Sequence, residues 1–295
     1  RRSTRCWGYM SQVHSQLEAI PSATVSLALC LLADWAFQAA PRRGWPVVAM
    51  GCGAGLALLL NPSLILLLIP LMAWLCIHRR VPLARMGRAL AVAALVSLPW
   101  VVRNAAVLGE VGFIRANLGL ELYVSNNDCA RPSLTRNLTS GCLHLTHPNF
   151  NLDEAGLVAQ LGEPAYNRSR LRLALQWMRN HPGAFLRLTA RRALEFWFPD
   201  PHGFRPFAYG IWLMTALSFI GLWQLERDKV PAARLLWTLV IVYPLLFYLI
   251  QSAMRYRYPM FWVSLLGAGY FVATLRPRSA GLPVGNRLRE TGCGA

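Results

Sequence analysis

The chain has 295 residues, 55% of them hydrophobic, and a formal net charge of +17. A hydrophobic fraction this high, gathered into long apolar runs, is typical of a membrane protein and excludes an ordinary single water-soluble core. The charge comes almost entirely from arginines beside those runs, and Lys229 is the only lysine. Because these arginines form no single basic face, we expect no nucleic-acid partner; at the ends of spans, arginines orient helices and pair with lipid phosphates.

Seven apolar segments alternate with polar connections, and each is predicted to be a helix that crosses or nearly crosses a bilayer. In chain order they are residues 22–40, 46–60, 63–78, 89–102, 207–224, 233–252 and 258–275. The second and third would each be only about 22 Å long as helices, so we expect a tight hairpin or a pair of thin spans around Asn61-Pro62. The predicted fold class is mainly α, a polytopic membrane helix bundle of about seven spans with an extracytoplasmic insert that is mixed but mostly helical.

The basic connections set the expected orientation of these spans. They are residues 41–44, 79–88 and 225–234 and the tail from residue 276. Arginine and lysine are enriched in cytoplasmic loops, so these four segments are predicted to be cytoplasmic, and seven crossings of the inner (plasma) membrane satisfy all of them. Residue 1 then lies outside. Because the polar N-terminal segment carries no signal sequence to bring it there, we expect the chain to be the C-terminal part of a larger protein.

Four regions follow from this topology. They are a transmembrane region (1–103, truncated at its N-terminus), an extracytoplasmic domain (104–206), a second transmembrane region (207–276) and a disordered cytoplasmic tail (277–295). Within the extracytoplasmic domain, Val111 to Val124 is predicted to be strand-like or irregular. Apolar spacing predicts helices near 163–180 and 186–197. The latter carries Arg187, Arg191 and Arg192 on its polar side, which suits a basic amphipathic helix on the membrane surface.

Cysteines and glycines add two packing expectations. Cys129 and Cys142 both fall in the predicted extracytoplasmic domain and are expected to form a disulfide if that domain faces an oxidising compartment. Gly51, Gly53 and Gly55 lie in an apolar run that follows no strand. They are therefore predicted to allow close helix packing rather than to bind a nucleotide.

Acidic residues are few, 13 in the whole chain. Asp34 lies inside the first predicted span, where an acid is a functional candidate by default; the alternative is that it snorkels or pairs with Arg42 or Arg43. Glu18 lies just outside that span. It could orient an acceptor, bind a metal or pair with Arg103, or it could simply be an acid favoured by the dipole at a helix N-terminus.

Three arginines, Arg103, Arg255 and Arg257, flank the predicted outer ends of spans. Their guanidinium groups could grip the phosphate of a lipid-linked substrate, or they could snorkel to headgroups and anchor the helices. His144 and His147 offer two metal ligands without a third, so no metal site is assigned. A divalent metal stays open as a cofactor.

Three longer stretches share a recognisable pattern. They are Gly55-Leu-Ala-Leu-Leu-Leu-Asn61-Pro62 before an apolar run and a basic loop, Leu98-Pro-Trp-Val-Val-Arg103-Asn104 continuing through Asn117-Leu-Gly119 to Ser125-Asn126-Asn127, and Arg255-Tyr-Arg257-Tyr-Pro259. With His181-Pro182 between two helices, this arrangement resembles the polytopic glycosyltransferases of the GT-C fold. The similar group is the bacterial, family 39-like set around protein O-mannosyltransferases and lipid A aminoarabinose transferases.

The resemblance implies transfer of a sugar from a polyprenyl-phosphate donor, the co-substrate, to an extracytoplasmic acceptor. It implies phosphate contacts at Arg103, Arg255 and Arg257 and a wall of the acceptor cavity at Glu18. The family's general base lies in a loop between its first two spans, which corresponds to a position upstream of residue 1, so the catalytic residue is unassigned. The alternatives are a transporter or flippase component for lipid-linked saccharides and, less favoured, a binding module confined to 104–206. The oligomeric state is left open.

Overall fold

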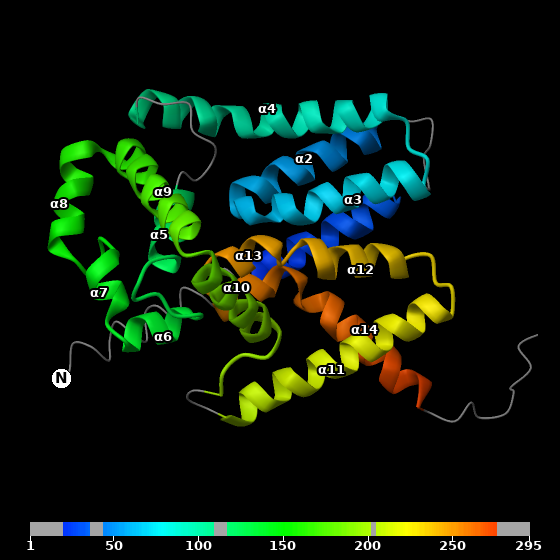
Figure 1. The fold of residues 1–295 in the computed structure, drawn as a ribbon. Helices are drawn as coiled ribbons and strands as arrows, with labels where there is room; N and C mark the ends of the chain where they lie inside the picture. The colour runs from blue at the N-terminus through cyan, green and yellow to red at the C-terminus, as the bar shows by residue number, and fades with distance from the viewer. Residues whose placement is uncertain (1–19, 36–43, 109–116, 202–204, 276–295) are drawn as a thin grey trace, which may run out of the picture.

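The computed structural model describes residues 20–35, 44–108, 117–201 and 205–275, and these are almost entirely helical (Figure 1). The first described helix is Ile20–Trp35. The membrane-type helices that follow are α2 (Trp45–Leu60), η1 (Pro62–Leu64), α3 (Ile65–His78), α4 (Leu83–Leu108), α11 (Arg205–Arg227), α12 (Ala233–Val242), α13 (Leu245–Leu249), η2 (Met254–Met260) and α14 (Phe261–Thr274). Between α4 and α11 lie six helices: α5 (Leu118–Ser125), α6 (Leu134–Thr139), α7 (Cys142–Thr146), α8 (Leu152–Leu161), α9 (Glu163–Asn180) and α10 (Pro182–Trp197).

Three helices are long and apolar enough to cross a membrane by themselves: Leu83–Val107, Arg205–Arg227 and Met254–Leu275. Four further apolar helices are shorter: Ile20–Trp35, Trp45–Leu60, Pro62–His78 and Ala233–Leu249. Every apolar segment singled out in the sequence is thus mainly helical where the structure describes it, although the one predicted at 233–252 is interrupted after Val242 and ends at Leu249. The lengths support a membrane protein, while the count of seven crossings stays a prediction.

The predicted strand-like start of the polar region is wrong over its described part. Leu118–Ser125 forms the helix α5, and among the described residues the only β-type pairing is an isolated bridge between Ser133 and Ser252. The reason is packing of α5 against α9. A Cβ on Gly119 would lie 2.1 Å from the backbone oxygen of Asn167, so glycine there lets the two helices touch, and this contact overrides the alternating apolar pattern.

Glycines also set the close approach of two long helix pairs. A Cβ on Gly51 would lie 2.6 Å from the Ala89 carbonyl oxygen, and one on Gly55 would meet Val96 at 2.7 Å, so α2 packs directly on α4. On α11, a Cβ on Gly221 would lie 1.8 Å from the Gly267 carbonyl oxygen of α14. The packing role predicted for the α2 glycines is therefore confirmed for Gly51 and Gly55, because small residues let helix backbones approach.

Two of the connections predicted to be cytoplasmic are described by the structure, those between α3 and α4 and between α11 and α12, and they lie at the same end of the long helices; α5 to α10 gather at the other end (Figure 1). At the first end Arg79 contacts Asp34 at 2.7 Å, and the Tyr270 hydroxyl donates to Asp228 at 2.5 Å. The pairing of Asp34 thus involves Arg79; Arg42 and Arg43 lie outside the described residues. This sharing of one end is what alternating crossings require.

Candidate functional site

The polar region, defined as residues 117–201, contacts the membrane-type helices in several places, and one of these is the segment Leu249–Ser252 at the end of α13. Here α13 has ended and Ile250 is extended. The Gln251 amide donates to the Ser125 hydroxyl at 2.8 Å, and the Ser252 amide donates to the Pro132 carbonyl at 2.8 Å. Because this segment makes no helical hydrogen bonds of its own, the polar region supplies the partners that its backbone needs.

Arg192 completes this junction from α10. Its guanidinium donates to the Leu249 carbonyl and to the Asn126 side-chain oxygen, each at 3.0 Å, and also to the Ser125 carbonyl. Burial lowers the pKa of Arg192 to about 10. The sequence placed Arg192 with Arg187 and Arg191 on a polar helix face, and that is wrong for Arg192, which is fully buried while the other two are exposed. Arg192 is buried because carbonyl groups at the ends of α5 and α13 accept hydrogen bonds from its guanidinium.

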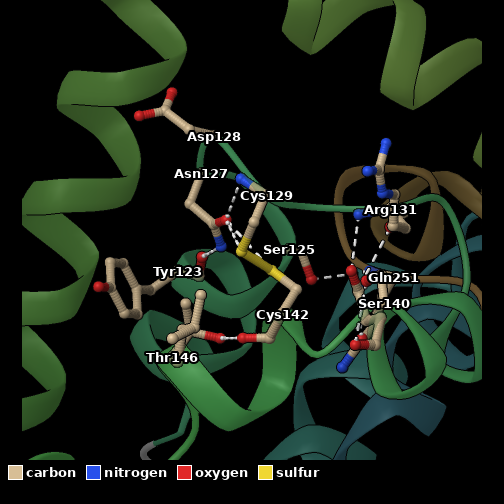
Figure 2. The surroundings of a disulfide bond; sticks show 12 residues. Tyr123, Ser125, Asn127, Asp128, Cys129, Arg131, Ser140, Cys142, Thr146 and Gln251 are labelled. Atoms are coloured by element: carbon tan, nitrogen blue, oxygen red, sulfur yellow. Dashed lines mark hydrogen bonds between the residues drawn. A yellow bond between two sulfur atoms is a disulfide. The ribbon is translucent and has the colours of Figure 1, made fainter.

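The predicted disulfide is present in the structure. Cys129, which follows α5, is bonded to Cys142 at the start of α7 (Figure 2). The Asn127 side-chain oxygen accepts from the Cys129 amide at 3.0 Å, and the Thr146 hydroxyl donates to the Cys142 carbonyl at 2.9 Å. This bond fixes the chain between α5 and α7, the stretch that also contacts Leu249–Ser252.

A pocket of about 430 Å³ opens beside this junction, between the polar region and the start of α11. Its walls come from α6, the end of α10 and the chain after it, α11, and the segment before η2. The lining side chains include Thr135, Arg136, Glu195, Phe196, Pro199, Asp200, Phe207, Ile211 and Met254. The volume falls in the range of roughly 300–1,000 Å³ that small-molecule sites occupy.

Three charged side chains define the polar wall of this pocket. Arg136 contacts Glu195 at 3.6 Å and also forms an ion pair with Asp200. The carboxylates are 13% and 18% exposed, and the Glu195 Oε2 atom has no hydrogen-bond partner among the described residues. Two mostly buried carboxylates face a single guanidinium, so this wall has more hydrogen-bond acceptors than donors. Such a wall suits a ligand that carries hydroxyl or amine groups.

An apolar groove of about 380 Å³ lies beside this pocket, along α11. It is lined by Pro206, Phe207, Gly210, Ile211, Met214 and Phe261. Phe207 and Ile211 line both the pocket and the groove. The charged pocket and the apolar groove therefore lie next to each other on the surface of α11. A ligand with a polar head and a hydrocarbon tail requires such a pair of sites.

None of the predicted site residues that the structure describes lines this pocket. Arg255 directly follows the lining residue Met254; it is exposed and stacks on Tyr256 at 5.2 Å. Arg103 is exposed on α4, where it contacts Trp100 and Asn104 of its own helix, and it does not line the pocket. Glu18 lies outside the described residues.

Arg257 is buried, with 1% of its surface exposed. Its guanidinium donates to the Trp197 carbonyl at 3.0 Å and to the Thr215 hydroxyl at 2.6 Å, and it lies over the Trp197 ring. The sequence placed this arginine at an accessible span end. The structure places it inside, where it ties η2 to α10 and α11.

Arg136, Glu195 and Asp200 were not identified from the sequence. Arg136 and Glu195 come from separate helices, and Asp200 lies three residues beyond the end of α10. The one usable signal was the scarcity of acids in the chain. Among the residues that the structure describes, no group of three or more histidine, cysteine, aspartate or glutamate side chains could hold a metal ion, His144 and His147 included.

Comparison with models of protein families, with curated proteins and with solved structures returns no match for this chain.

Proposed function

We propose that this chain belongs to a membrane glycosyltransferase that transfers a sugar from a polyprenyl-phosphate donor to an extracytoplasmic acceptor. The observation that carries the proposal is the joining of the charged pocket to the apolar groove through Phe207 and Ile211. A polyprenyl chain is hydrocarbon and its sugar is rich in hydroxyl groups. The groove suits the first and the pocket the second.

The proposed topology has seven crossings of the inner membrane, with residues 104–206 outside. Two observations support it. The described connections α3–α4 and α11–α12, both predicted to be cytoplasmic, lie at one end, where Arg79 contacts Asp34. At the opposite end the Cys129–Cys142 disulfide lies in the polar region, and disulfides persist in oxidising compartments, which include the space outside the inner membrane.

In this proposal the pocket binds and orients the transferred sugar or the acceptor. Glu195 and Asp200 accept hydrogen bonds from its hydroxyl groups, and Arg136 holds both carboxylates in place. Arg255 is exposed and directly follows the lining residue Met254, and in this proposal its guanidinium contacts the donor phosphate as charge develops on the leaving group.

A photoreactive polyprenyl-phosphate sugar tests the site in purified full-length protein. Gly210→Trp places a large ring at a residue that lines the groove, and a Cβ built there has nothing within 4 Å. We expect this variant to lose most labelling of α11. Leu213→Trp is the matched control, since Leu213 is exposed on the same helix and does not line the groove. Equal labelling of both variants and the parent protein would refute the site.

A transporter or flippase component for lipid-linked saccharides is the second candidate. It is favoured by the ion pairs of Arg136, which leave the pocket wall without a spare guanidinium to stabilise a leaving phosphate. The two candidates differ in product. Transfer of a labelled sugar to an acceptor, lost in Glu195→Gln, supports the transferase. Movement of an intact lipid-linked sugar across vesicles, without transfer, supports the transporter.

A further inference from the structure

A second pocket, of about 510 Å³, lies at the opposite end of the helices, where α3, α11 and α12 meet. Four of its lining side chains can carry positive charge: His78, Arg79, Lys229 and Arg234. Trp74, Val230 and Pro231 form its apolar part. Cationic groups beside an indole at the end of membrane-type helices match the depth at which lipid phosphates lie.

The acidic residues near this pocket do not cancel its positive charge. Arg79 pairs with Asp34 at 2.7 Å, and Arg234 approaches Glu226 at 3.4 Å. The second pair is well exposed, with side chains 68% and 42% accessible, so it is weak and easily exchanged. Lys229 adds a cation, and the pocket therefore has a positive excess.

The backbone gives an independent observation. Arg80 and Lys229 are the only non-glycine residues with positive φ in the part of the chain that the structure describes, at 51° and 57°. Lys229 ends α11 in a Schellman motif: its amide donates to the Glu226 carbonyl, and the Val230 amide donates to the Leu225 carbonyl. Glycine is the usual residue at that position. A lysine held there against its backbone preference points to a role for its charge.

Trp74 supplies a further donor. It is only 6% exposed, it lines the pocket, and its indole N–H has no hydrogen-bond partner among the described residues. Arg79 lies over the Trp74 ring at 5.1 Å. A buried N–H without an acceptor is uncommon in folded proteins, and a ligand oxygen that reached the indole would satisfy it.

We propose that this pocket binds the phosphate group of an anionic phospholipid, with Lys229, Arg79 and Arg234 around the headgroup and Val230 and Pro231 against its glycerol end. The proposal does not depend on the function assigned to the other pocket. The chemistry that recognises the ligand is the phosphate. The apolar wall and the position at the helix ends favour a lipid over a soluble phosphate.

The test measures lipid retention by native mass spectrometry of the full chain, using phosphatidylglycerol as the anionic probe and phosphatidylcholine as the zwitterionic one. Lys229→Gly removes the charge at a position where glycine is favoured, so the variant is expected to fold at least as well as the parent. We expect its apparent affinity for phosphatidylglycerol to fall by about fivefold or more, with Lys229→Arg close to the parent.

Arg88→Gln is the matched control, because Arg88 is an exposed arginine at the same basic end that does not line the pocket. Its affinity for phosphatidylglycerol should stay close to that of the parent. An equal loss in Arg88→Gln, or no loss in Lys229→Gly, would overturn the site. Displacement of the lipid by glycerol phosphate at equal concentration would overturn its assignment to a lipid.

Discussion

Arg192 donates a hydrogen bond of 3.0 Å to the backbone carbonyl of Leu249, 57 residues further along the chain. The same buried guanidinium serves Asn126 and the Ser125 carbonyl. One cation thus joins α5, α10 and the end of α13, and its described partners are carbonyl and amide oxygens. Removing it takes the donor away from the buried Asn126 side-chain oxygen and from the Ser125 carbonyl, while the Leu249 carbonyl keeps the Asn126 amide at 3.0 Å. Acceptors buried without a donor cost more than the hydrogen bonds contribute when made.

Arg192→Leu is therefore expected to lower the free energy of unfolding by on the order of 3 kcal/mol. The measurement is thermal unfolding of the purified protein in detergent. Arg191→Leu is the matched control, because Arg191 is the exposed neighbour on the same helix. If both variants unfold at the temperature of the parent, the junction is not held by Arg192.

Arg255 and Arg257 are expected to respond differently to the same change. Arg257→Ala removes the donor to Trp197 and Thr215 and leaves a space beneath the Trp197 ring, so it should destabilise the protein by about 2–3 kcal/mol. Arg255→Ala should leave stability unchanged, because the side chain is exposed, and should weaken labelling by the polyprenyl-phosphate probe. Thermal midpoints and labelling yields measure the two effects. The reverse pattern would show that Arg257 is the ligand-contacting residue.

Gly221→Ala should separate α11 from α14. The added Cβ would meet the Gly267 carbonyl oxygen at 1.8 Å, and backbone cannot yield as a flexible side chain can. We expect a loss of about 1–3 kcal/mol in stability, the usual cost of overpacking. Gly269→Ala on α14, where nothing lies within 4 Å of the Cβ, should be neutral or slightly stabilising. Equal thermal midpoints for the two variants would contradict the close packing.

Tyr166 predicts a loss of stability at high pH. Burial, together with the hydrogen bond from its hydroxyl to Glu154 at 2.6 Å, raises the pKa of Tyr166 to about 12. An unfolded tyrosine loses its proton near pH 10. The Tyr166 contribution to stability is thus intact below about pH 10 and is lost as the pH rises toward 12. Tyr166→Phe should flatten this part of the curve of thermal midpoint against pH. An unchanged slope would mean that other groups control it.

Long apolar periodicity made the helices predictable, although their ends were not. The span expected at 89–102 is part of α4, which begins at Leu83. The predicted boundary was too late because Arg88 was assigned to a basic loop. In the structure Arg88 lies exposed on the first turns of the helix. Leu118–Ser125 was missed for a different reason, since its helix depends on the contact of Gly119 with α9.

The pocket could not be predicted, because its charged wall is made only by tertiary packing. Arg136 and Glu195 are 59 positions apart, and nothing in either local pattern marks them as partners. Arg191 and Arg192 make the same point within one helix: adjacent arginines look equivalent in sequence, yet one is exposed and the other is buried. Arg192 rather than Arg191 is buried because α5 and α13 supply hydrogen-bond acceptors at its position.

The extended Leu249–Ser252 segment also determines how the molecule can come apart. Its backbone groups lie at the end of apolar helices, where bare amides and carbonyls are costly. Unfolding of the polar region alone would leave these backbone groups without partners. We therefore expect the polar region and the membrane-type helices to unfold together, because separate unfolding would cost free energy. Loss of the junction and loss of the helix bundle should appear as a single cooperative step, and excising residues 117–201 should leave a bundle that does not assemble.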